Sequence, residues 1–307
     1  MQGEIINKYL LDIKTVYYHG SCPDGITSRE ILKLQFPDLI YIPYYFTEFK
    51  KVPDHALFID CSPKSNQVEE CLRNSCLIAE HHDSFNDSFN KWFPLYPDQM
   101  LIGDTKKAES GAILALELVR QLGLGDDLNL AYIQHVARLI AISDTWQNSH
   151  EEFEYARMLA GYIAFFGNDF CEELADLYLK RDVILSFGRV QQKKQEQYAR
   201  QAIKVGKVAF INELNMSNAA EILRNEGSDL VVGYTTKFEP NENRNITIFS
   251  LRSKEDGFDC SAFCKAHGGG GHKAAAGFSV DYGLMEPIAR FVEFLKKENY
   301  AHLFGIN

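Results

Sequence analysis

Two patterns of apolar and polar residues alternate along the first half of the chain. Short runs rich in β-branched and aromatic residues predict strands, at 15–20, 39–45, 56–62, 76–82 and 101–103. Segments with apolar residues at helical spacing predict helices, at 26–36, 65–74, 109–122 and 128–142. Strands separated by helices are typical of a doubly wound, mostly parallel sheet, and we therefore expect an α/β domain.

The pattern changes after residue 188. Residues 189–204 are strongly polar and predict a solvated helix that links two domains. The segments that follow predict strands at 207–211, 230–236 and 246–251, then a glycine-rich run and a helix at 285–299. The expected division is a catalytic domain at 1–187, a linker helix at 188–205 and a smaller α+β domain at 206–307.

The composition is that of a folded protein. Hydrophobic residues make up 46% and charged residues 24% of the 307 positions, as in soluble globular proteins. The first residues lack the apolar core of a signal peptide, and no later run approaches a membrane span. The seven scattered cysteines then indicate reduced thiols and a cytoplasmic location. The net charge of −10 disfavours a protein that coats long DNA, but does not exclude a small anionic substrate beside metal ions.

Polar residues that can bind metals directly follow several predicted strands. His19, Asp60 and His81 each stand at the carboxyl end of one strand. In an open α/β sheet, ligands bind at that edge. We therefore expect these three side chains to belong to one site.

The segment HGSCPDG, residues 19–25, places His19, Cys22 and Asp24 on one tight turn after a strand. A turn of this spacing can present its side chains to one or two metal ions. The alternative for Asp24 is the N-cap of the following helix, which is a common role for aspartate.

Three further segments also leave two interpretations open. Asp60 follows the apolar run ALFI and is either a ligand or a residue that caps a loop. In EHHD, residues 80–83, the adjacent imidazoles point to different sides, so one can bind a metal while the other faces a substrate; the alternative is a surface pair. Asp144 follows an apolar helix and is either a ligand or a turn residue. Carboxylates and imidazoles together suit Mn²⁺, Mg²⁺, Zn²⁺ or Fe²⁺, and two such ions about 3.5–4 Å apart can share a carboxylate, activate a water molecule and clamp a phosphoryl group.

In this order, the segments resemble the DHH/DHHA1 phosphoesterase superfamily, which includes RecJ-type exonucleases, nanoRNases, cyclic-dinucleotide phosphodiesterases and exopolyphosphatase-related proteins. HGSCPDG resembles the first motif, FIDCS (58–62) the second, EHH the third and AISDT (141–145) the fourth. GGGGHKAAAGF (268–278) is similar to the GGGH signature of the DHHA1 domain and is the most specific single match. The resemblance covers nearly the whole chain.

The resemblance implies a centre with two divalent metal ions, usually Mn²⁺, with Asp60 as the bridging ligand. The implied ligands are His19, Cys22 and Asp60 for one ion, and Asp24, Asp60, His81 and Asp144 for the other. His82 would contact the scissile phosphate or assist the leaving group. The expected catalytic residues are therefore His82 and Asp60.

The sequence departs from the family pattern at two positions. Cys22 stands where the family usually has an aspartate ligand. A thiolate prefers softer metals, so this site is weaker, favours Zn²⁺ or Fe²⁺, or is completed by water. Glu80 replaces the aspartate of the DHH triplet, but it keeps a carboxylate that can orient its neighbours.

The glycine-rich run is the expected substrate-binding segment of the second domain. Glycines let the backbone approach a ligand and expose N–H groups to an anion, and a helix predicted to begin at 274–277 would add its N-terminus. The alternative is a flexible surface loop. The residues expected to bind substrate are Gly269, Gly270, Gly271, His272 and Arg252. Arg252 resembles the basic residue that pairs with a substrate phosphate in this family; its alternative is a solvated arginine at a strand edge.

A zinc site in the second domain is the less favoured interpretation of another pattern. Cys260, Cys264, His267 and His272 have a gap of only two residues between the pairs, where finger-type sites use about 12. Cys260, Phe263, Cys264 and His267 also fall on one helix face. We therefore expect buried core cysteines.

Together these patterns predict a hydrolase with a site in a cleft between two domains. Its substrate would be a small phosphorylated molecule, such as a short oligonucleotide, a bisphosphorylated nucleotide or a linear dinucleotide. The expected partner is therefore such a substrate or a short single-stranded nucleic acid, and not a membrane. The alternatives are an exopolyphosphatase-like hydrolase of short polyphosphate, and a non-catalytic nucleotide-binding module weakened by Cys22. The oligomeric state stays open, with a homodimer among the alternatives.

Overall fold

The computed structural model describes residues 2–5, 7–20, 22–121, 128–166, 176–177, 180–239, 244–254, 256–281 and 287–304. The chain divides into two compact units, Met1–Arg189 and Val190–Asn307. Among the described residues, each unit contains one six-stranded sheet. No helix in the described part of the chain is both long enough and apolar enough to cross a membrane.

The first unit is built on a sheet with the strand order β1-β6-β5-β4-β2-β3. These strands are β1 (Gln2–Ile5), β2 (Thr15–His19), β3 (Ile40–Tyr44), β4 (Ala56–Ile59), β5 (Leu77–Glu80) and β6 (Gln99–Ile102). Strands β2 to β6 run parallel, while β1 pairs antiparallel with β6. The predicted strands and the α/β fold class are confirmed.

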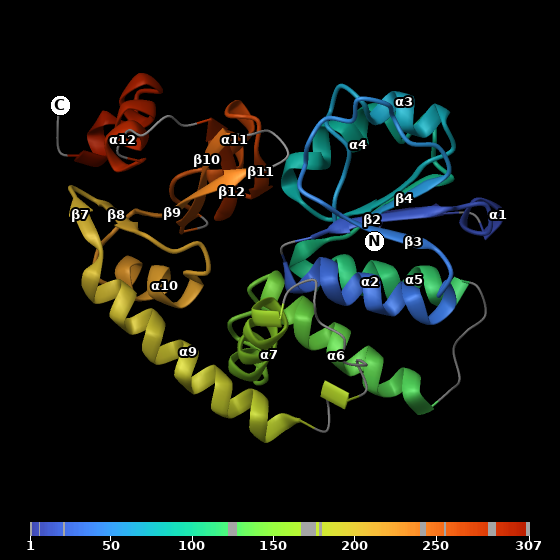
Figure 1. Cartoon of the computed structure of the whole chain (residues 1–307), viewed down its shortest axis with the longest axis horizontal. Helices are drawn as coiled ribbons and strands as arrows, with labels where there is room; N and C mark the ends of the chain where they lie inside the picture. The colour runs from blue at the N-terminus through green and yellow to red at the C-terminus, as the bar shows by residue number, and fades with distance from the viewer. Residues whose placement is uncertain are drawn as a thin grey trace. The chain divides into compact units, whose positions relative to one another are not determined.

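Helices cover both faces of this sheet (Figure 1). Short helices α3 (Val68–Arg73) and α4 (Asn86–Trp92) lie on one face, and α2 (Pro23–Gln35) and α5 (Gly111–Gln121) on the other. The first unit also contains α1 (Asn7–Leu10), η1 (Asp83–Phe85), η2 (Thr105–Lys107), α6 (Leu128–Asp144) and α7 (Phe153–Phe166). In β4, Leu57 and Ile59 belong to the core that includes α2, α5, α6 and α7, whereas Phe58 belongs to the core with α3 and α4. A parallel strand covered on both faces needs an unbroken apolar run, and ALFI is such a run.

The neighbours β2 and β4 mark the point where the strand order reverses. The chain leaves β2 through α2 on one face of the sheet, and it leaves β4 through α3 on the other face. Ligands of open α/β sheets bind outside the carboxyl ends of the strands at such a point. His19 is the last residue of β2, Asp60 follows β4 and His81 follows β5, so the structure places all three at this edge, as predicted.

The second unit contains a mixed sheet with the order β11-β12-β10-β9-β8-β7. Its strands are β7 (Ile203–Val205), β8 (Val208–Ile211), β9 (Leu230–Glu239), β10 (Arg244–Ser253), β11 (Gly270–His272) and β12 (Ala275–Asp281). Its helices are α10 (Ser217–Asn225), α11 (Cys260–Ala266), α12 (Pro287–Lys297) and η4 (Ala301–Phe304). Alternate residues of β8 enter two cores, Val208 and Phe210 with α11 and α12, Ala209 and Ile211 with α10. This period of two follows from the pleat of a strand.

Helix α9 (Arg181–Gln201) spans the boundary between the units, beginning before the predicted linker at 188. The prediction of a helix here is confirmed, and most of its residues are exposed or half-buried, although one face packs on the second unit. Gln195 and Ala199 are buried in the second unit. The Gln195 side chain accepts hydrogen bonds from the backbone N–H groups of Asn218 and Ala219, at 3.1 and 3.0 Å. It thereby caps α10, whose own N-cap residue, Met216, supplies no side-chain hydrogen bond.

The glycine-rich run is followed by a strand, so the helix predicted to begin at 274–277 is wrong. Ala276 and Phe278 are buried while their neighbours in β12 are more exposed, which is the period of a strand. A Cβ added at Gly269 would lie 2.1 Å from the carbonyl oxygen of Gly277 and 2.5 Å from Cβ of Phe278. Glycine at 269 therefore lets two backbone segments pack directly against each other.

The buried cysteines of α11 are confirmed. Cys260 and Cys264 are fully buried in a core with Phe263 and Phe249. Within the described ranges, no group of side chains close enough to share a metal ion includes either cysteine. His267 instead lies 2.7 Å from a carboxylate oxygen of Glu298.

Candidate metal centre

The loop after β2 is held by a cysteine at the start of helix α2. Cys22 is the N-cap of this helix, and its Sγ accepts a hydrogen bond from the backbone N–H of Gly25 at 3.1 Å. Pro23 follows at the first helical position, which suits its fixed φ and its missing N–H. Asp24 lies inside the first turn, so the alternative that it is the N-cap of α2 is wrong.

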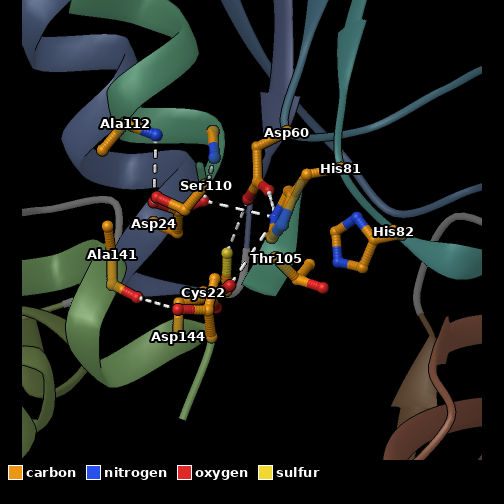
Figure 2. A network of polar contacts seen from close by, with 12 residues as sticks. Cys22, Asp24, Asp60, His81, His82, Thr105, Ser110, Ala112, Ala141 and Asp144 are labelled. Carbon is orange, nitrogen blue, oxygen red and sulfur yellow. Dashed lines mark hydrogen bonds and ion pairs between the residues drawn. The ribbon is translucent and has the colours of Figure 1, made fainter. Parts of the chain in front are cut away.

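Asp60 stands between two groups of donors (Figure 2). Its Oδ2 accepts a hydrogen bond from Cys22 Sγ at 2.9 Å and lies 3.5 Å from His19 Nδ1. Its Oδ1 lies 2.8 Å from His81 Nε2. The residue is fully buried and has a φ of 57°, which is uncommon for any residue except glycine. Strained conformations of this kind cluster at functional sites, and this one turns one carboxylate toward both groups.

Three carboxylates surround the imidazole of His81. Its Nε2 lies 2.8 Å from Asp60 Oδ1, 3.5 Å from Asp24 Oδ2 and 3.6 Å from Asp144 Oδ2. Asp144 is the last residue of α6, so α6 also contributes to the cluster. The structure therefore brings together all six residues predicted as metal ligands, from β2, α2, β4, β5 and α6, and their role as ligands stays a prediction.

The N-terminus of α5 holds Asp24 in place. Ser110 Oγ and the N–H of Ala112 donate to Asp24 Oδ1 at 2.6 and 3.0 Å, and the N–H of Gly111 donates to Oδ2 at 2.6 Å. A Cβ at Gly111 would lie 2.4 Å from Cβ of Asp60, so only glycine lets this helix approach both carboxylates. Ser110 and Gly111 were not among the site residues predicted from the sequence. A serine before an apolar helix suggests a cap, but nothing local points to a partner 86 positions away.

His82 is held by Glu80. Glu80 Oε1 lies 2.5 Å from His82 Nδ1 and accepts a hydrogen bond from the backbone N–H of His81 at 3.0 Å. Burial alone would lower the pKa of His82, but the charge of Glu80 raises it to about 9. Both histidines are buried, so the alternative of a surface pair is wrong. Figure 2 shows the His82 ring beside that of His81, and the two ring centroids lie 4.6 Å apart. The expected division between a metal ligand and a phosphate contact stays a prediction.

The acidic groups of the cluster destabilise one another's charges. Burial raises the pKa of Asp24 well above its usual range, and the charges of Asp60 and Asp144 raise it further. Burial also raises the pKa of Asp144. Burial and the nearby Asp60 raise the pKa of the Cys22 thiol. The thiol therefore stays protonated and donates a hydrogen bond to Asp60.

Positive charge from histidine offsets part of this repulsion. Burial alone would raise the pKa of Asp60, but the neighbouring imidazoles of His19 and His81 hold it well below its usual range. Burial alone would lower the pKa of His81, whereas its hydrogen bond to Asp60 and the charge of Asp144 raise it to about 10. A buried group of carboxylates that draws a proton onto a histidine is a place where a cation would be stabilised.

The donors fit divalent metal ions. Several groups of side chains have donor atoms that all lie within 4.8 Å of one another. One group contains His19, Cys22 and Asp60, and another contains Asp24, His81 and Asp144. A further group in the same unit contains Asp60, Glu80, His81 and His82. Ligand atoms that share one ion at about 2.0–2.2 Å lie about 2.8–3.6 Å apart, as several of these pairs do. His19 Nδ1 is buried and has no hydrogen-bond partner among the described residues. A metal ion bound with Cys22 and Asp60 would give this nitrogen a partner.

Four of the five predicted substrate-binding residues of the second unit lie in strands of its sheet, and Gly269 directly precedes β11. Arg252 is in β10, which pairs with both β9 and β12, so the alternative of a strand-edge arginine is wrong. Its Nη1 donates to Ser250 Oγ at 3.0 Å and to the carbonyl oxygen of Leu251 at 2.9 Å. Gly270, Gly271 and His272 form β11, an edge strand of the sheet rather than a loop. Their contact with substrate stays a prediction.

The fold and the donor cluster define a two-unit α/β protein with a candidate metal centre at the switch point of its first sheet. The family model described as the DHHA1 domain matches residues 201–299. The match covers most of the second unit, and the resemblance of this part of the chain to the DHHA1 domain is confirmed.

No curated protein shows significant similarity to the chain. Among solved structures, it resembles an exopolyphosphatase-related protein from Bacteroides fragilis, with 16% identity, coverage of 96% of this chain and 95% of that one, and a TM-score of 0.43. RecJ from Thermus thermophilus, solved with Mg²⁺, shows 13% identity over 97% of this chain and 51% of that one, with a TM-score of 0.42. The pGpG-specific phosphodiesterase PggH from Vibrio cholerae shows 11% identity over 96% of this chain and all of that one, with a TM-score of 0.40. Similarity this low does not by itself assign a function.

Proposed function

We propose that this chain is a metal-dependent phosphoesterase that hydrolyses a small phosphorylated substrate at the cluster in its first unit. The observation that carries this proposal is the arrangement around Asp60, whose two carboxylate oxygens face separate groups of donors. A buried carboxylate in this arrangement suits a bridge between two cations. An isolated structural aspartate would need only one partner group.

The residues of the chain have distinct parts in this proposal. His19, Cys22 and Asp60 would hold one divalent ion, and Asp24, Asp60, His81 and Asp144 the other. Bound there, the ions would polarise a phosphoryl oxygen and lower the pKa of a water molecule. Mn²⁺ is the first expectation, and Mg²⁺, Zn²⁺ and Fe²⁺ also suit the donor set.

His82 would contact the phosphate. Its Nδ1 is bound to Glu80, so Nε2 is the nitrogen that would donate to a phosphate oxygen or protonate the leaving group. Glu80 keeps this orientation fixed, which is what the aspartate of the triplet would do with a side chain one methylene shorter. In the DHHA1 domain, we assign Arg252, Gly269, Gly270, Gly271 and His272 to substrate binding.

The experiment that tests the function is hydrolysis by the purified full chain with Mn²⁺, Mg²⁺, Zn²⁺ or Fe²⁺. The substrates are a 3′,5′-bisphosphorylated nucleotide, a linear dinucleotide, short oligonucleotides and short polyphosphate. We expect turnover of at least one of them. In Asp60→Ala, we expect activity to fall more than about 100-fold, because substitutions of residues that only orient metal ligands already reduce activity about 10- to 100-fold. Asp12→Ala, a change at an exposed aspartate of the same unit, is the control.

A second candidate is a nucleotide-binding module without turnover, and one observation favours it. The Cys22 thiol already caps α2 and donates to Asp60. Metal bound without hydrolysis of any substrate in the panel, by a folded protein, would contradict the phosphoesterase and support the binding module.

A further inference from the structure

The connection from β3 to β4 is a loop held by side-chain hydrogen bonds, whereas the other parallel strands of this sheet are connected through helices. Tyr44 donates its hydroxyl hydrogen to the carbonyl oxygen of Thr47 at 2.6 Å. The side chain of Gln67 both accepts from the N–H of Phe49 and donates to its carbonyl oxygen, each at 2.9 Å. The Phe49 ring stacks on Tyr44 with centroids 5.1 Å apart. These contacts fix residues 44–49 on the core of the first unit.

Phe46 lies in the middle of this loop with a φ of 56°. Such a conformation is an outlier for a bulky side chain, and a glycine or an asparagine would adopt it at less cost. The hydrogen bonds of Tyr44 and Gln67 hold the loop in this conformation. Strained conformations of this kind cluster at functional sites. The question is therefore what an aromatic ring contributes at this position.

The ring of Phe46 lies beside the candidate metal centre. Its centroid is 5.1 Å from that of His19 and 6.4 Å from that of His82, with nearly perpendicular planes in both pairs. Phe46 is only half-buried. The neighbouring Tyr45 is 55% exposed, and a Cβ added at Gly20 would lie 3.0 Å from its ring. Phe46 thus borders both histidines that the proposed function assigns to metal and phosphate, and Tyr45 lies beside Gly20, the residue after His19.

We propose that Phe46 is a specificity-determining residue, against which a nucleobase of the substrate stacks. The proposal rests on the proposed function and specifies its substrate class as nucleotides rather than polyphosphate. A base has a π-face and an apolar surface that an aromatic ring binds, whereas a polyphosphate chain has only charged oxygens. Phe46 cannot ligate a metal, so its contribution is to substrate binding and not to the metal centre.

The test compares a 5′-phosphorylated adenine dinucleotide with the same sugar–phosphate chain without bases. In Phe46→Ala, we expect kcat/KM for the dinucleotide to fall about 5- to 150-fold, mainly through KM, because stacking on one aromatic residue contributes about 1–3 kcal/mol per base. The abasic substrate should change little. Phe46→Leu keeps apolar contacts with His19 and His82 but lacks the aromatic face, so it should also lose discrimination between the substrates. Tyr132→Ala, at an exposed aromatic residue of α6, is the matched control.

Equal loss on both substrates in Phe46→Ala, or a wild type that does not discriminate between them, would overturn the assignment and leave the phosphoesterase intact. If neither substrate is hydrolysed, the proposed function fails separately. Binding then decides the question, with AMP and inorganic phosphate titrated into the Mn²⁺-loaded protein. Weaker binding of AMP alone in Phe46→Ala supports the stacking contact, and unchanged binding of both ligands contradicts it. Mn²⁺ affinity and far-ultraviolet circular dichroism show whether each variant is folded.

Discussion

The loop after β2 and the glycine-rich run of the second unit are both conspicuous in the sequence, yet different forces shape them. The first has partners from distant parts of the chain, since Cys22 contacts Asp60 across 38 positions and Asp24 contacts Ser110 across 86. In the second, the glycines pack against the adjacent strand β12. Polar side chains that converge from far apart point to a ligand, whereas glycines that meet a neighbouring backbone have a packing role in addition to the substrate contact that we propose for them.

The largest expected difference between the two regions comes from adding one methyl group to each. In Gly111→Ala, the new Cβ would lie 2.4 Å from Cβ of Asp60 and 2.8 Å from Asp24 Oδ2. The helix must then move away from both carboxylates. We expect hydrolysis to fall more than about 100-fold and Mn²⁺ affinity to fall with it, because outer partners of metal ligands alone contribute 10- to 100-fold. Titration calorimetry with Mn²⁺ and an assay of the same sample measure both.

Gly269→Ala is the matched change in the second unit. Its Cβ meets the backbone of β12, so the expected cost is about 1–3 kcal/mol of folding stability, with Mn²⁺ affinity unchanged. Denaturant unfolding measures the first quantity and calorimetry the second. A normal Mn²⁺ affinity in a folded Gly111→Ala protein would contradict the role given to the start of α5.

The second comparison places aspartate at one cysteine of each region. Cys264 is fully buried among apolar side chains, so Cys264→Asp should destabilise the second unit by more than about 3 kcal/mol. Cys22→Asp should be tolerated when Mn²⁺ is present, because aspartate is a good N-cap and a good oxygen ligand. Without metal, its charge beside Asp60 should lower the melting temperature.

Activity adds a second readout for Cys22→Asp. We expect Mn²⁺-dependent hydrolysis to be preserved or raised. Complete loss of activity in a folded, Mn²⁺-stabilised variant would mean that the cysteine has a role of its own. Melting curves with Mn²⁺ and with a chelator separate this outcome from simple unfolding.

The strands, most helices and the edge that carries the cluster could be predicted because each depends on local patterns. ALFI predicts a buried parallel strand, and the polar residue after it is at the ligand-binding edge by topology. The strand at 275–281 could not be predicted in the same way. Its alanines are compatible with a helix, and the pairing with β10 that makes it a strand is a non-local contact.

The candidate site shows the same limit. His19, Asp60 and His81 follow strands, so strand topology gathers them. Ser110 and Gly111 act through a helix end whose partner is set only by the packing of α5 on α2. Phe46 has no local signal at all, because its left-handed conformation comes from hydrogen bonds made by Tyr44 and Gln67.

Proton release on metal binding gives a third, smaller contrast. The pKa of Cys22 is raised by burial and by Asp60, so the thiol is protonated near neutral pH and must lose its proton to become a ligand. Its contribution to Mn²⁺ affinity should therefore rise with pH, by about tenfold per unit below its pKa. The raised pKa of His81 also makes Mn²⁺ affinity rise with pH. This second contribution should be the same in wild type and in Cys22→Asp.

Comparing wild type with Cys22→Asp therefore measures the contribution of the Cys22 thiol to proton release. Calorimetry in two buffers of different ionisation enthalpy counts the protons released per Mn²⁺ bound. Wild type should release about one more proton than Cys22→Asp, and the pH dependence of its affinity should be steeper. Equal proton counts would show that Cys22 keeps its proton and that the first site is completed by another ligand, such as water.

The smallest expected effects come from substituting two buried serines, one in each region. Ser110 donates to Asp24, and Ser261 donates to the carbonyl oxygen of Gly271 at 2.9 Å. Each substitution by alanine removes one hydrogen bond and should cost about 0.5–1.5 kcal/mol of folding stability. Only Ser110→Ala should also weaken Mn²⁺ binding, by about tenfold, because Asp24 then keeps two of its three hydrogen bonds and is held less firmly. If both variants bind Mn²⁺ as wild type does, the serine at the start of α5 only stabilises the fold, and the backbone N–H groups of Gly111 and Ala112 suffice to position the carboxylate.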